Sequence, residues 1–320
     1  MNQTTFATKD CSQSKMENTS DLDQLVTIRS QGNQAPLFCI HPSGGDVGIF
    51  RKLVTRLAPN RPVLGIQSRM LCGARRELSS LHEIASTYAE IIKAKQPCGA
   101  ISIIGFSLGG FIATLMAEEL CAAGRTVSFL GLIDSNPSWT AADETTHREL
   151  CLRLEQVFTK FQSIGMMNTK PLETVQRDVS ILIDACLRNP SVSSEEVMSQ
   201  IDSMGYVPSG SVELGFLTKF TSSFLAHCSL LADFEPPQID CPLHLWWPSE
   251  SVDESDLGSS LWENRASSNV IESIVEGSHY SIMRGPTVRQ LASEIDAALD
   301  AALDAADAVG LSVAEPIESS

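Results

Sequence analysis

The sequence lacks the features of several large protein classes. Its 320 residues contain no uninterrupted apolar run of about 18, so no segment is predicted to span a membrane. Residues 1–20 are polar and without an apolar core, and we do not expect them to act as a secretory signal. The nine cysteines form no C-x-x-C pair and no metal-ligand spacing, which argues against a metal site and favours reduced thiols in a cytoplasmic protein. Glycine-rich stretches lack the nucleotide-binding patterns, and no bound cofactor is expected.

Positive charge is also scarce. A net charge of −16 disfavours binding to nucleic acid or to an anionic membrane, because both are polyanions. The segment from Gly45 to Lys95 is the exception, since its nine basic and four acidic residues give it a charge of +5. This segment is interpreted either as charge scattered over solvated helix faces or as a landing area for an acidic partner or a phosphate-bearing substrate.

Apolar strand patterns alternate with helical patterns along most of the chain. Strands are expected at 36–41, 62–67, 101–104, 127–134, 241–247 and 270–275. This alternation predicts an α/β fold with a mostly parallel sheet and helices on both of its faces. Residues 139–210 contain helical patterns without any strand, and they are interpreted as a helical lid inserted over the carboxyl edge of the sheet. An accessory subdomain remote from the site is the alternative.

Composition suggests how the chain is divided. Residues 1–30 form a polar, flexible leader, in which Leu25–Ile28 add a short edge strand. Residues 31–300 form the α/β domain with its insertion, and residues 301–320 form an acidic, alanine-rich tail. The repeat from Asp296 to Asp307 is expected to extend the last helix into solvent, because aspartates four residues apart repel one another.

The segment Gly105-Phe-Ser-Leu-Gly109 joins the 101–104 strand to the helical pattern at 108–120. The chain must turn so sharply between them that side chains flanking the serine would collide, and glycines occupy those positions. A serine on such a turn has its hydroxyl raised above the sheet beside a helix N-terminus. Ser107 is therefore the predicted nucleophile, and a purely structural glycine-rich turn is the alternative.

A serine nucleophile needs a base and an acid that orients the base. His279 follows the last buried strand and comes last in the order nucleophile, acid, base, so it is the predicted base. Asp134 ends the strand after the nucleophile helix, where its carboxylate would face the crevice that holds Ser107. Asp134 is the predicted acid. The rival acids lie in the loop after the Trp246-Trp247 strand and are Glu250, Asp253, Glu254 and Asp256.

Acyl transfer also needs N–H donors for the oxyanion. The N–H of Leu108, directly after the nucleophile, is the first predicted donor. The second comes from the loop Pro42-Ser-Gly-Gly45 after the first long strand, with Ser43 preferred and Gly44 next. His41, which precedes this loop, is expected to support its backbone.

Four motifs stand in the order Pro36-Leu-Phe-Cys-Ile-His-Pro-Ser-Gly-Gly45, Gly105-Phe-Ser-Leu-Gly-Gly110, Leu132-Ile-Asp-Ser-Asn-Pro137 and Gly277-Ser-His279. With them, residues 25–300 resemble the thioesterase domains of non-ribosomal peptide and polyketide synthetases, which belong to the α/β-hydrolase superfamily. The resemblance implies that Ser107 accepts an acyl or peptidyl chain from the phosphopantetheine thioester of a carrier protein. Hydrolysis, cyclisation or transfer to an acceptor then releases the chain. The carrier is the implied partner, with segment 45–95 as its candidate docking site, and it brings the phosphopantetheine arm with it.

Other functions remain open at this stage. The position of Asp134 is typical of chain-terminating domains, whereas stand-alone editing (type II) thioesterases more often place the acid after the following strand. The chain begins with Met and contains no carrier segment, which suits a protein acting in trans or an excised domain. A free carboxylesterase or lipase would share the same three residues. A non-catalytic α/β-hydrolase binding module would be expected to have lost one of them.

Overall fold

A seven-stranded sheet forms the centre of the computed structural model, which describes residues 19–74, 76–137, 144–188, 194–231, 234–252, 258–268, 270–279, 281–308 and 310. Its order is β1-β3-β2-β4-β5-β6-β7. The strands are β1 Leu25–Arg29, β2 Leu37–Ile40, β3 Val63–Ile66, β4 Ile101–Phe106, β5 Val127–Ile133, β6 Leu243–Pro248 and β7 Val270–Val275. All neighbours pair in parallel except β1, which runs antiparallel to β3. The mostly parallel α/β sheet is confirmed, and β1 joins it ahead of residue 31.

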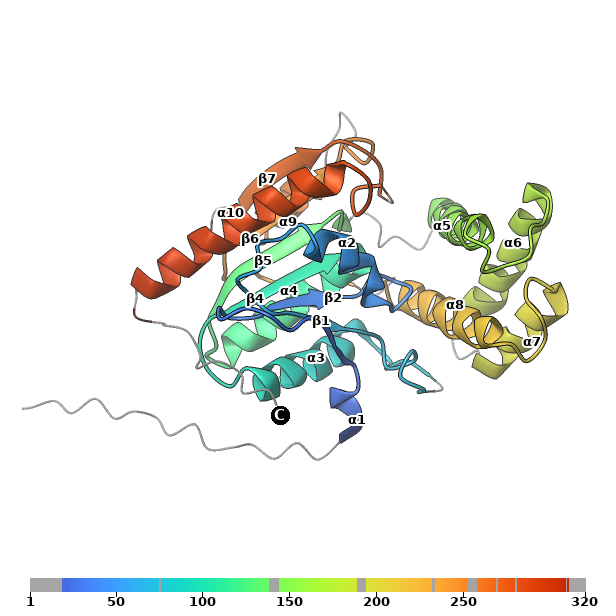
Figure 1. Ribbon diagram of the computed structural model, residues 1–320, viewed down its shortest axis with the longest axis horizontal. Helices are drawn as coiled ribbons and strands as arrows, with labels where there is room; N and C mark the ends of the chain where they lie inside the picture. Colours follow the sequence, from blue (N-terminus) through green and yellow to red (C-terminus); the bar gives the residue numbers. More distant parts are fainter. Residues whose placement is uncertain are drawn as a thin grey trace, which may run out of the picture.

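Helices cover both faces of the sheet (Figure 1). On one face α3 (Leu81–Lys95) packs against α4 (Leu108–Ala122), and together they close one apolar core. On the other face α2 (Arg51–Val54) packs against α10 (Thr287–Ala308) over a second core. Because parallel strands end at the same edge, this arrangement collects the loops after β2, β4, β5 and β7 at one edge of the sheet.

The short elements are α1 (Thr19–Leu22), the 3-10 helix η1 (Val47–Phe50) and α9 (Gly258–Glu263). Asp46 caps η1, since its carboxylate accepts the N–H of Gly48. The aspartate repeat forms part of α10, as expected, but one side of it is buried. Leu299 is only 1% exposed, and Asp296 accepts the N–H of Ala58. A period of four residues keeps one side of a helix apolar, so this side packs on the sheet while the remaining aspartates face solvent.

The four helices α5 (Glu144–Ser163), α6 (Leu172–Arg188), α7 (Ser194–Met204) and α8 (Val212–Leu230) confirm the helical patterns between β5 and β6. They share an apolar core that is separate from the two cores of the sheet. Figure 1 shows α5, α6 and α7 to one side of the sheet, with α8 beside them. The insertion is therefore a packed helical unit, and α8 carries the chain back toward the sheet.

None of the helices in the described ranges is long and apolar enough to cross a membrane.

Candidate functional site

Ser107 lies between the last residue of β4 and the first residue of α4. Its backbone has φ 56° and ψ −124°, a strained conformation for a residue other than glycine. Two hydrogen bonds hold it: its N–H donates to the carbonyl of Ile133 at 2.9 Å, and its own carbonyl accepts the hydroxyl of Ser135 at 2.7 Å. The neighbouring strand β5 therefore stabilises the strained turn.

The glycines of this turn are required by close backbone contacts. A Cβ at Gly105 would lie 2.1 Å from the carbonyl oxygen of Gly109. A Cβ at Gly109 would lie 2.3 Å from the carbonyl oxygen of Ile40 on β2. Both distances are far below van der Waals contact, so the motif fits the sharp strand-to-helix turn that the sequence predicts at Ser107.

Asp134 and His279 form a hydrogen-bonded pair although they lie 145 positions apart in the chain. His279 Nδ1 lies 2.6 Å from Asp134 Oδ2, and the same oxygen accepts the hydroxyl of Ser251 at 3.2 Å. The ring of Phe106, next to Ser107, stacks on the imidazole of His279 with centroids 4.8 Å apart. A carboxylate on Nδ1 sets the tautomer in which Nε2 serves as the base.

Asp134 differs from the rival acids in its surroundings. Its side chain is fully buried, its φ is 45°, and its N–H donates to the carbonyl of Trp246 at 2.8 Å. Glu250 is exposed, and its N–H donates to the carbonyl of Gly277 at 2.9 Å. The other three rivals, Asp253, Glu254 and Asp256, lie outside the described residues. Of the acids that the structure describes, Asp134 is the one that holds His279.

The predicted oxyanion donors lie on a helix end and on the loop after β2. Leu108 is the first residue of α4, and the first N–H groups of a helix have no acceptor within the helix. Ser43 is 8% exposed and lies in a tight turn. A hydrogen bond of 2.8 Å from the N–H of Gly45 to the carbonyl of Pro42 closes this turn. The sequence predicts both donors, and the structure places them at the carboxyl ends of the adjacent strands β4 and β2.

A buried polar network, which no pattern in the sequence predicts, lies behind this loop. His41 Nδ1 donates to the carbonyl of Pro42 at 2.8 Å, and its Nε2 lies 2.7 Å from the hydroxyl of Tyr88. His227 on α8 donates from Nδ1 to the carbonyl of Ser43 at 2.8 Å and pairs through Nε2 with Glu77 at 3.1 Å. His41 supports the backbone, as expected. His227 is separated from Glu77 by 150 positions, and no local pattern marks either residue.

Charge in this network is uneven. Burial raises the pKa of Glu77, but the hydrogen bond and charge of His227 outweigh this effect and hold that pKa at about 2. Burial, together with the charge of His227, lowers the pKa of His41 to about 3. Near neutral pH, Glu77 is therefore a carboxylate and His41 a neutral imidazole. The two histidine rings lie 4.8 Å apart.

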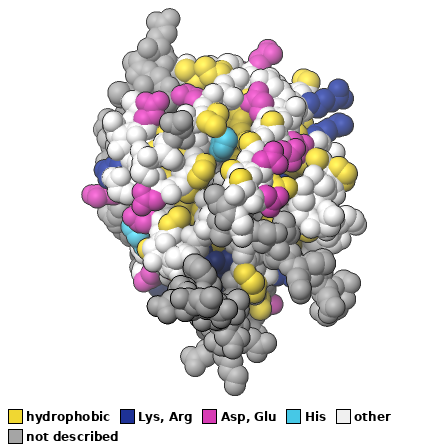
Figure 2. Space-filling view, turned by 90° about the vertical axis from the view of Figure 1, so that its left-hand side faces the viewer, with side chains coloured by type: hydrophobic (Ala, Val, Ile, Leu, Met, Phe, Trp, Pro, Cys, Tyr) yellow, Lys and Arg dark blue, Asp and Glu magenta, His cyan; other side chains and the backbone are white. Residues whose placement is uncertain are grey.

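The basic segment 45–95 does not form a single surface. Arg51 and Lys52 are exposed on α2, whereas Lys93 and Lys95 lie on α3, on the opposite face of the sheet. Arg61 is buried and donates to the carbonyl of Ala35. Figure 2 shows one side of the molecule, on which acidic and apolar side chains are scattered and basic side chains are few. Docking on this segment therefore finds no support, because consecutive helices of the segment cover opposite faces.

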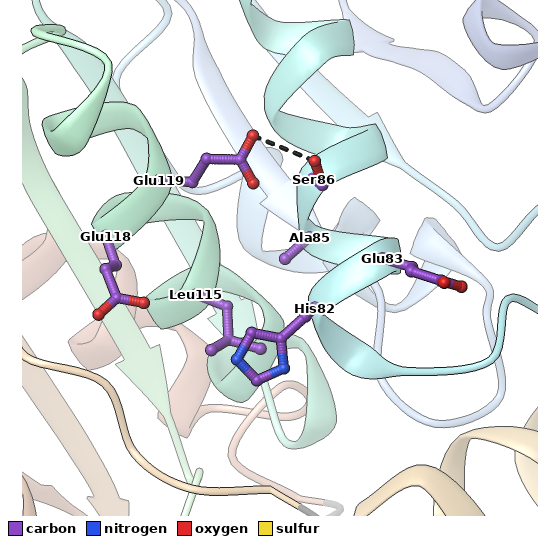
Figure 3. Close-up of a pocket in the computed structure, with 7 residues that line it drawn as sticks. All are labelled: His82, Glu83, Ala85, Ser86, Leu115, Glu118 and Glu119. Atoms are coloured by element: carbon purple, nitrogen blue, oxygen red, sulfur yellow. Dashed lines mark hydrogen bonds between the residues drawn. The ribbon is translucent and has the colours of Figure 1, made fainter.

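A groove between α3 and α4 has an acidic lining, formed by His82, Glu83, Ala85, Ser86, Leu115, Glu118 and Glu119 (Figure 3). The hydroxyl of Ser86 donates to Glu119 Oε1 at 3.1 Å across the groove. The groove contains none of the predicted site residues. In the described ranges no cluster of His, Cys, Asp and Glu has the arrangement of a metal site.

Comparisons with known proteins agree with the resemblance. Residues 35–187 match the family model of the thioesterase domain. The chain is 38% identical over 120 residues to a dimodular nonribosomal peptide synthase of Bacillus subtilis (strain 168), covering 37% of this chain and 5% of that protein. It is 36% identical over 124 residues to the atromentin synthetase nps3 of Serpula lacrymans, covering 39% of this chain and 13% of the synthetase. The chain thus spans a small part of the curated relatives it matches.

Solved structures share the fold. A four-domain nonribosomal peptide synthetase bound to AMP and glycine superposes with a TM-score of 0.64 at 22% identity, over 86% of this chain and 20% of that one. The NocB thioesterase domain, in covalent complex with a fluorophosphonate nocardicin G analog, superposes with a TM-score of 0.58 at 19% identity, over 86% of this chain and 99% of that one. The fold is that of the α/β-hydrolase thioesterase domains, as the sequence predicts. By its family match over residues 35–187 and by its relatives, the chain is similar to the thioesterase domains of nonribosomal peptide synthetases.

Proposed function

We propose that the chain releases an acyl or peptidyl group from a phosphopantetheinyl carrier protein through an acyl-Ser107 intermediate. The observation that carries this proposal is the pairing of His279 with buried Asp134, 2.6 Å apart, at the sheet edge that also holds the strained Ser107 turn. A generic binding module would have no need of a buried carboxylate hydrogen-bonded to a partly exposed imidazole. This pair has the form of the acid and base of a serine acyl-transfer enzyme.

The acylation step follows from these positions. His279 Nε2 accepts the proton of the Ser107 hydroxyl as Ser107 Oγ bonds to the thioester carbonyl carbon, and Asp134 stabilises the resulting imidazolium. The N–H groups of Leu108 and Ser43 stabilise the oxyanion. The C–S bond then breaks, and the phosphopantetheine thiol leaves with the proton from His279. The group on Ser107 is now an ester.

Release repeats the step with a new nucleophile. Water, or a hydroxyl or amine of the chain or of an acceptor, loses its proton to His279 and attacks the ester, which frees Ser107. The helices α5–α8 act as the lid that decides which nucleophile enters. Phe161 on α5 and Phe216 and Phe220 on α8 form a half-buried aromatic cluster, and a Cβ at Gly44 would lie 2.1 Å from the Phe220 ring. This cluster adjoins the loop 42–45 and favours an acyl chain with an apolar part.

The relatives support a carrier as the partner, because the curated matches include a dimodular nonribosomal peptide synthase and a nonribosomal peptide synthetase. The proposed partner is therefore a carrier protein, which supplies the phosphopantetheine arm as part of the substrate. The structure of α5–α8 supports their proposed role as a lid. These helices have an apolar core of their own, and α8 contacts the sheet domain at the 42–45 loop.

The test is capture of the acyl-enzyme. The protein is incubated with a panel of acyl-loaded carrier proteins, and intact mass spectrometry reads the adduct while the products are separated as linear, cyclic or transferred species. We expect an adduct on the wild type and none on Ser107→Ala. An adduct on Ser107→Ala would refute the nucleophile. Faster turnover of simple esters than of acyl-carriers would instead support a free esterase.

A further inference from the structure

The two peptide planes that flank Ser43 are each held by an imidazole. His41 Nδ1 donates to the carbonyl of Pro42, in the plane before Ser43, and His227 Nδ1 donates to the carbonyl of Ser43, in the plane after it; both distances are 2.8 Å. In a trans peptide the N–H points away from the carbonyl of the same plane. The two imidazoles therefore set the directions of the Ser43 and Gly44 N–H groups.

Both ring nitrogens of His227 face hydrogen-bond acceptors. A carbonyl oxygen and a carboxylate both accept hydrogen bonds, so Nδ1 facing Ser43 and Nε2 facing Glu77 must each carry a proton. The side chains of His227 and Glu77 are 0% and 3% exposed. Glu77 is itself held, since it accepts the hydroxyl of Ser68 at 2.7 Å and the N–H of Leu78 at 3.1 Å. The pair is thus a rigid, buried support.

Helix α8 also packs tightly against the loop. A Cβ at Gly44 would overlap the ring of Phe220, and a Cβ at Gly45 would lie 2.4 Å from the hydroxyl oxygen of Ser223. Gly45 has φ +81°, which favours glycine in any case. The loop glycines therefore leave room for α8 to pack closely against the loop.

We propose that His227, held by Glu77, is a positioning residue. Its hydrogen bond to the Ser43 carbonyl fixes the direction of the Gly44 N–H and steadies the backbone of Ser43, so that the 42–45 loop presents its donors to the oxyanion. This inference rests on the proposed acyl-transfer function. It also means that α8 joins the helical unit α5–α8 directly to the oxyanion loop. The pair does not touch the reacting atoms, and it acts through the backbone of Ser43.

The experiment compares two double variants that differ only in where residue 227 offers an N–H. In both, Glu77→Gln removes the charge, so that no carboxylate is left unpaired. His227→Asn places its amide nitrogen near the position of Nδ1, facing Ser43, whereas His227→Gln places it near the position of Nε2, facing residue 77. We expect the Asn variant to keep kcat within about fivefold of the wild type and the Gln variant to lose about 10- to 100-fold, because only the Asn variant keeps a donor that faces the Ser43 carbonyl.

The substrate is an octanoyl N-acetylcysteamine thioester, for which we expect KM to change less than about twofold in either variant, since the loop contacts the transition state. Amide hydrogen exchange, read by mass spectrometry over residues 42–46, should be faster in the Gln variant alone. Thermal unfolding verifies that both variants fold.

Equal kcat and equal exchange in the two variants would overturn the positioning role. Failure of the proposed function has a different signature, namely full turnover by Ser107→Ala. The exchange comparison decides the positioning of the loop in that case too, because it does not depend on turnover.

Discussion

Two histidine–carboxylate pairs lie at the two sides of the candidate site, and they differ in what their imidazoles can do. His279, in the loop after β7, is held by Asp134 through Nδ1, and 15% of its side chain remains exposed. His227, on α8, is completely buried and donates from both ring nitrogens, to Glu77 and to Ser43. An imidazole that donates from both nitrogens can hold neighbouring groups in place but has no lone pair with which to accept a proton.

The comparison distinguishes a histidine that is proposed to transfer protons from one that supports a loop. Both pairs bury their carboxylates, so burial of a charged pair does not by itself mark a catalytic site. The partner of the second ring nitrogen distinguishes them. For His227 that partner is the carbonyl of Ser43, whereas the proposed partner of His279 Nε2 is the hydroxyl of Ser107.

The largest contrast is expected between the two histidines. His279→Ala should lower kcat by about 10⁴-fold or more, because the proposed base is removed. His227→Asn should lower kcat by less than about tenfold, since a donor to Ser43 remains. Steady-state kinetics with one acyl thioester measures both, and circular dichroism verifies folding. Similar losses of kcat in the two variants would contradict the assignment of His279 as the base and His227 as the supporting residue.

The same chemical change in the two carboxylates gives a sharper test. Asp134→Asn should lower kcat by about 10⁴-fold, because an amide facing Nδ1 favours the tautomer in which Nε2 carries the proton. Glu77→Gln should lower it less than about tenfold, since a neutral His227 still donates from Nδ1 to Ser43. A ranking in which Glu77→Gln is the more damaging would reverse the assignment of the two pairs.

The pH dependence of stability should reveal the supporting pair. Glu77 has a folded pKa of about 2, below its ordinary value of 4.5, so its contribution is present above pH 4.5 and is lost as the pH falls toward 2. His41 has a folded pKa of about 3, below 6.5, so the unfolded state gains a proton first and stability also falls below pH 6.5.

Urea unfolding at a series of pH values measures this loss. The contribution of Glu77 is on the order of 3 kcal/mol. Glu77→Gln should flatten the curve below pH 4.5 while leaving a decline below pH 6.5. An unchanged curve in the variant would show that Glu77 carries no stabilising charge.

The smallest effect concerns the aromatic cluster of the helical unit. Phe220→Ala should raise KM for octanoyl thioesters by about tenfold, because apolar surface next to Gly44 is lost. Acetyl thioesters should change by less than about twofold, and Val212→Ala, an exposed position on the same helix, serves as the control. Equal effects on short and long acyl chains would show that the aromatic cluster does not contact the acyl group.

Much of the site follows from local sequence. Ser107 is marked by its flanking glycines between a buried strand and a helix. Glycine is required there because a Cβ at Gly105 or Gly109 would lie less than 2.5 Å from a backbone oxygen. Asp134 and His279 are marked by position, because both follow strands of a parallel sheet whose ends share one edge. The order of elements is therefore enough to bring them to the same region.

The roles of residues within helical patterns cannot be predicted from local sequence in the same way. His227 looks like an ordinary structural histidine in the sequence, since its partners Glu77 and Ser43 lie 150 and 184 positions away. The basic segment shows the converse, because residues adjacent in sequence separate when α2 and α3 pack on opposite faces of the sheet. Charge counted along a chain does not identify a surface.

The sequence by itself determined the parallel α/β sheet, the Ser107 turn and the positions of Asp134 and His279. Backbone conformation and strand order depend on short-range patterns of glycine and apolar residues. Only the tertiary structure decided that α8 packs against the 42–45 loop, that His227 donates to Ser43, and that Glu77 holds His227. Those contacts depend on how the helical unit docks on the sheet domain. Docking is set by the shape and polarity of surfaces that no single stretch of sequence contains.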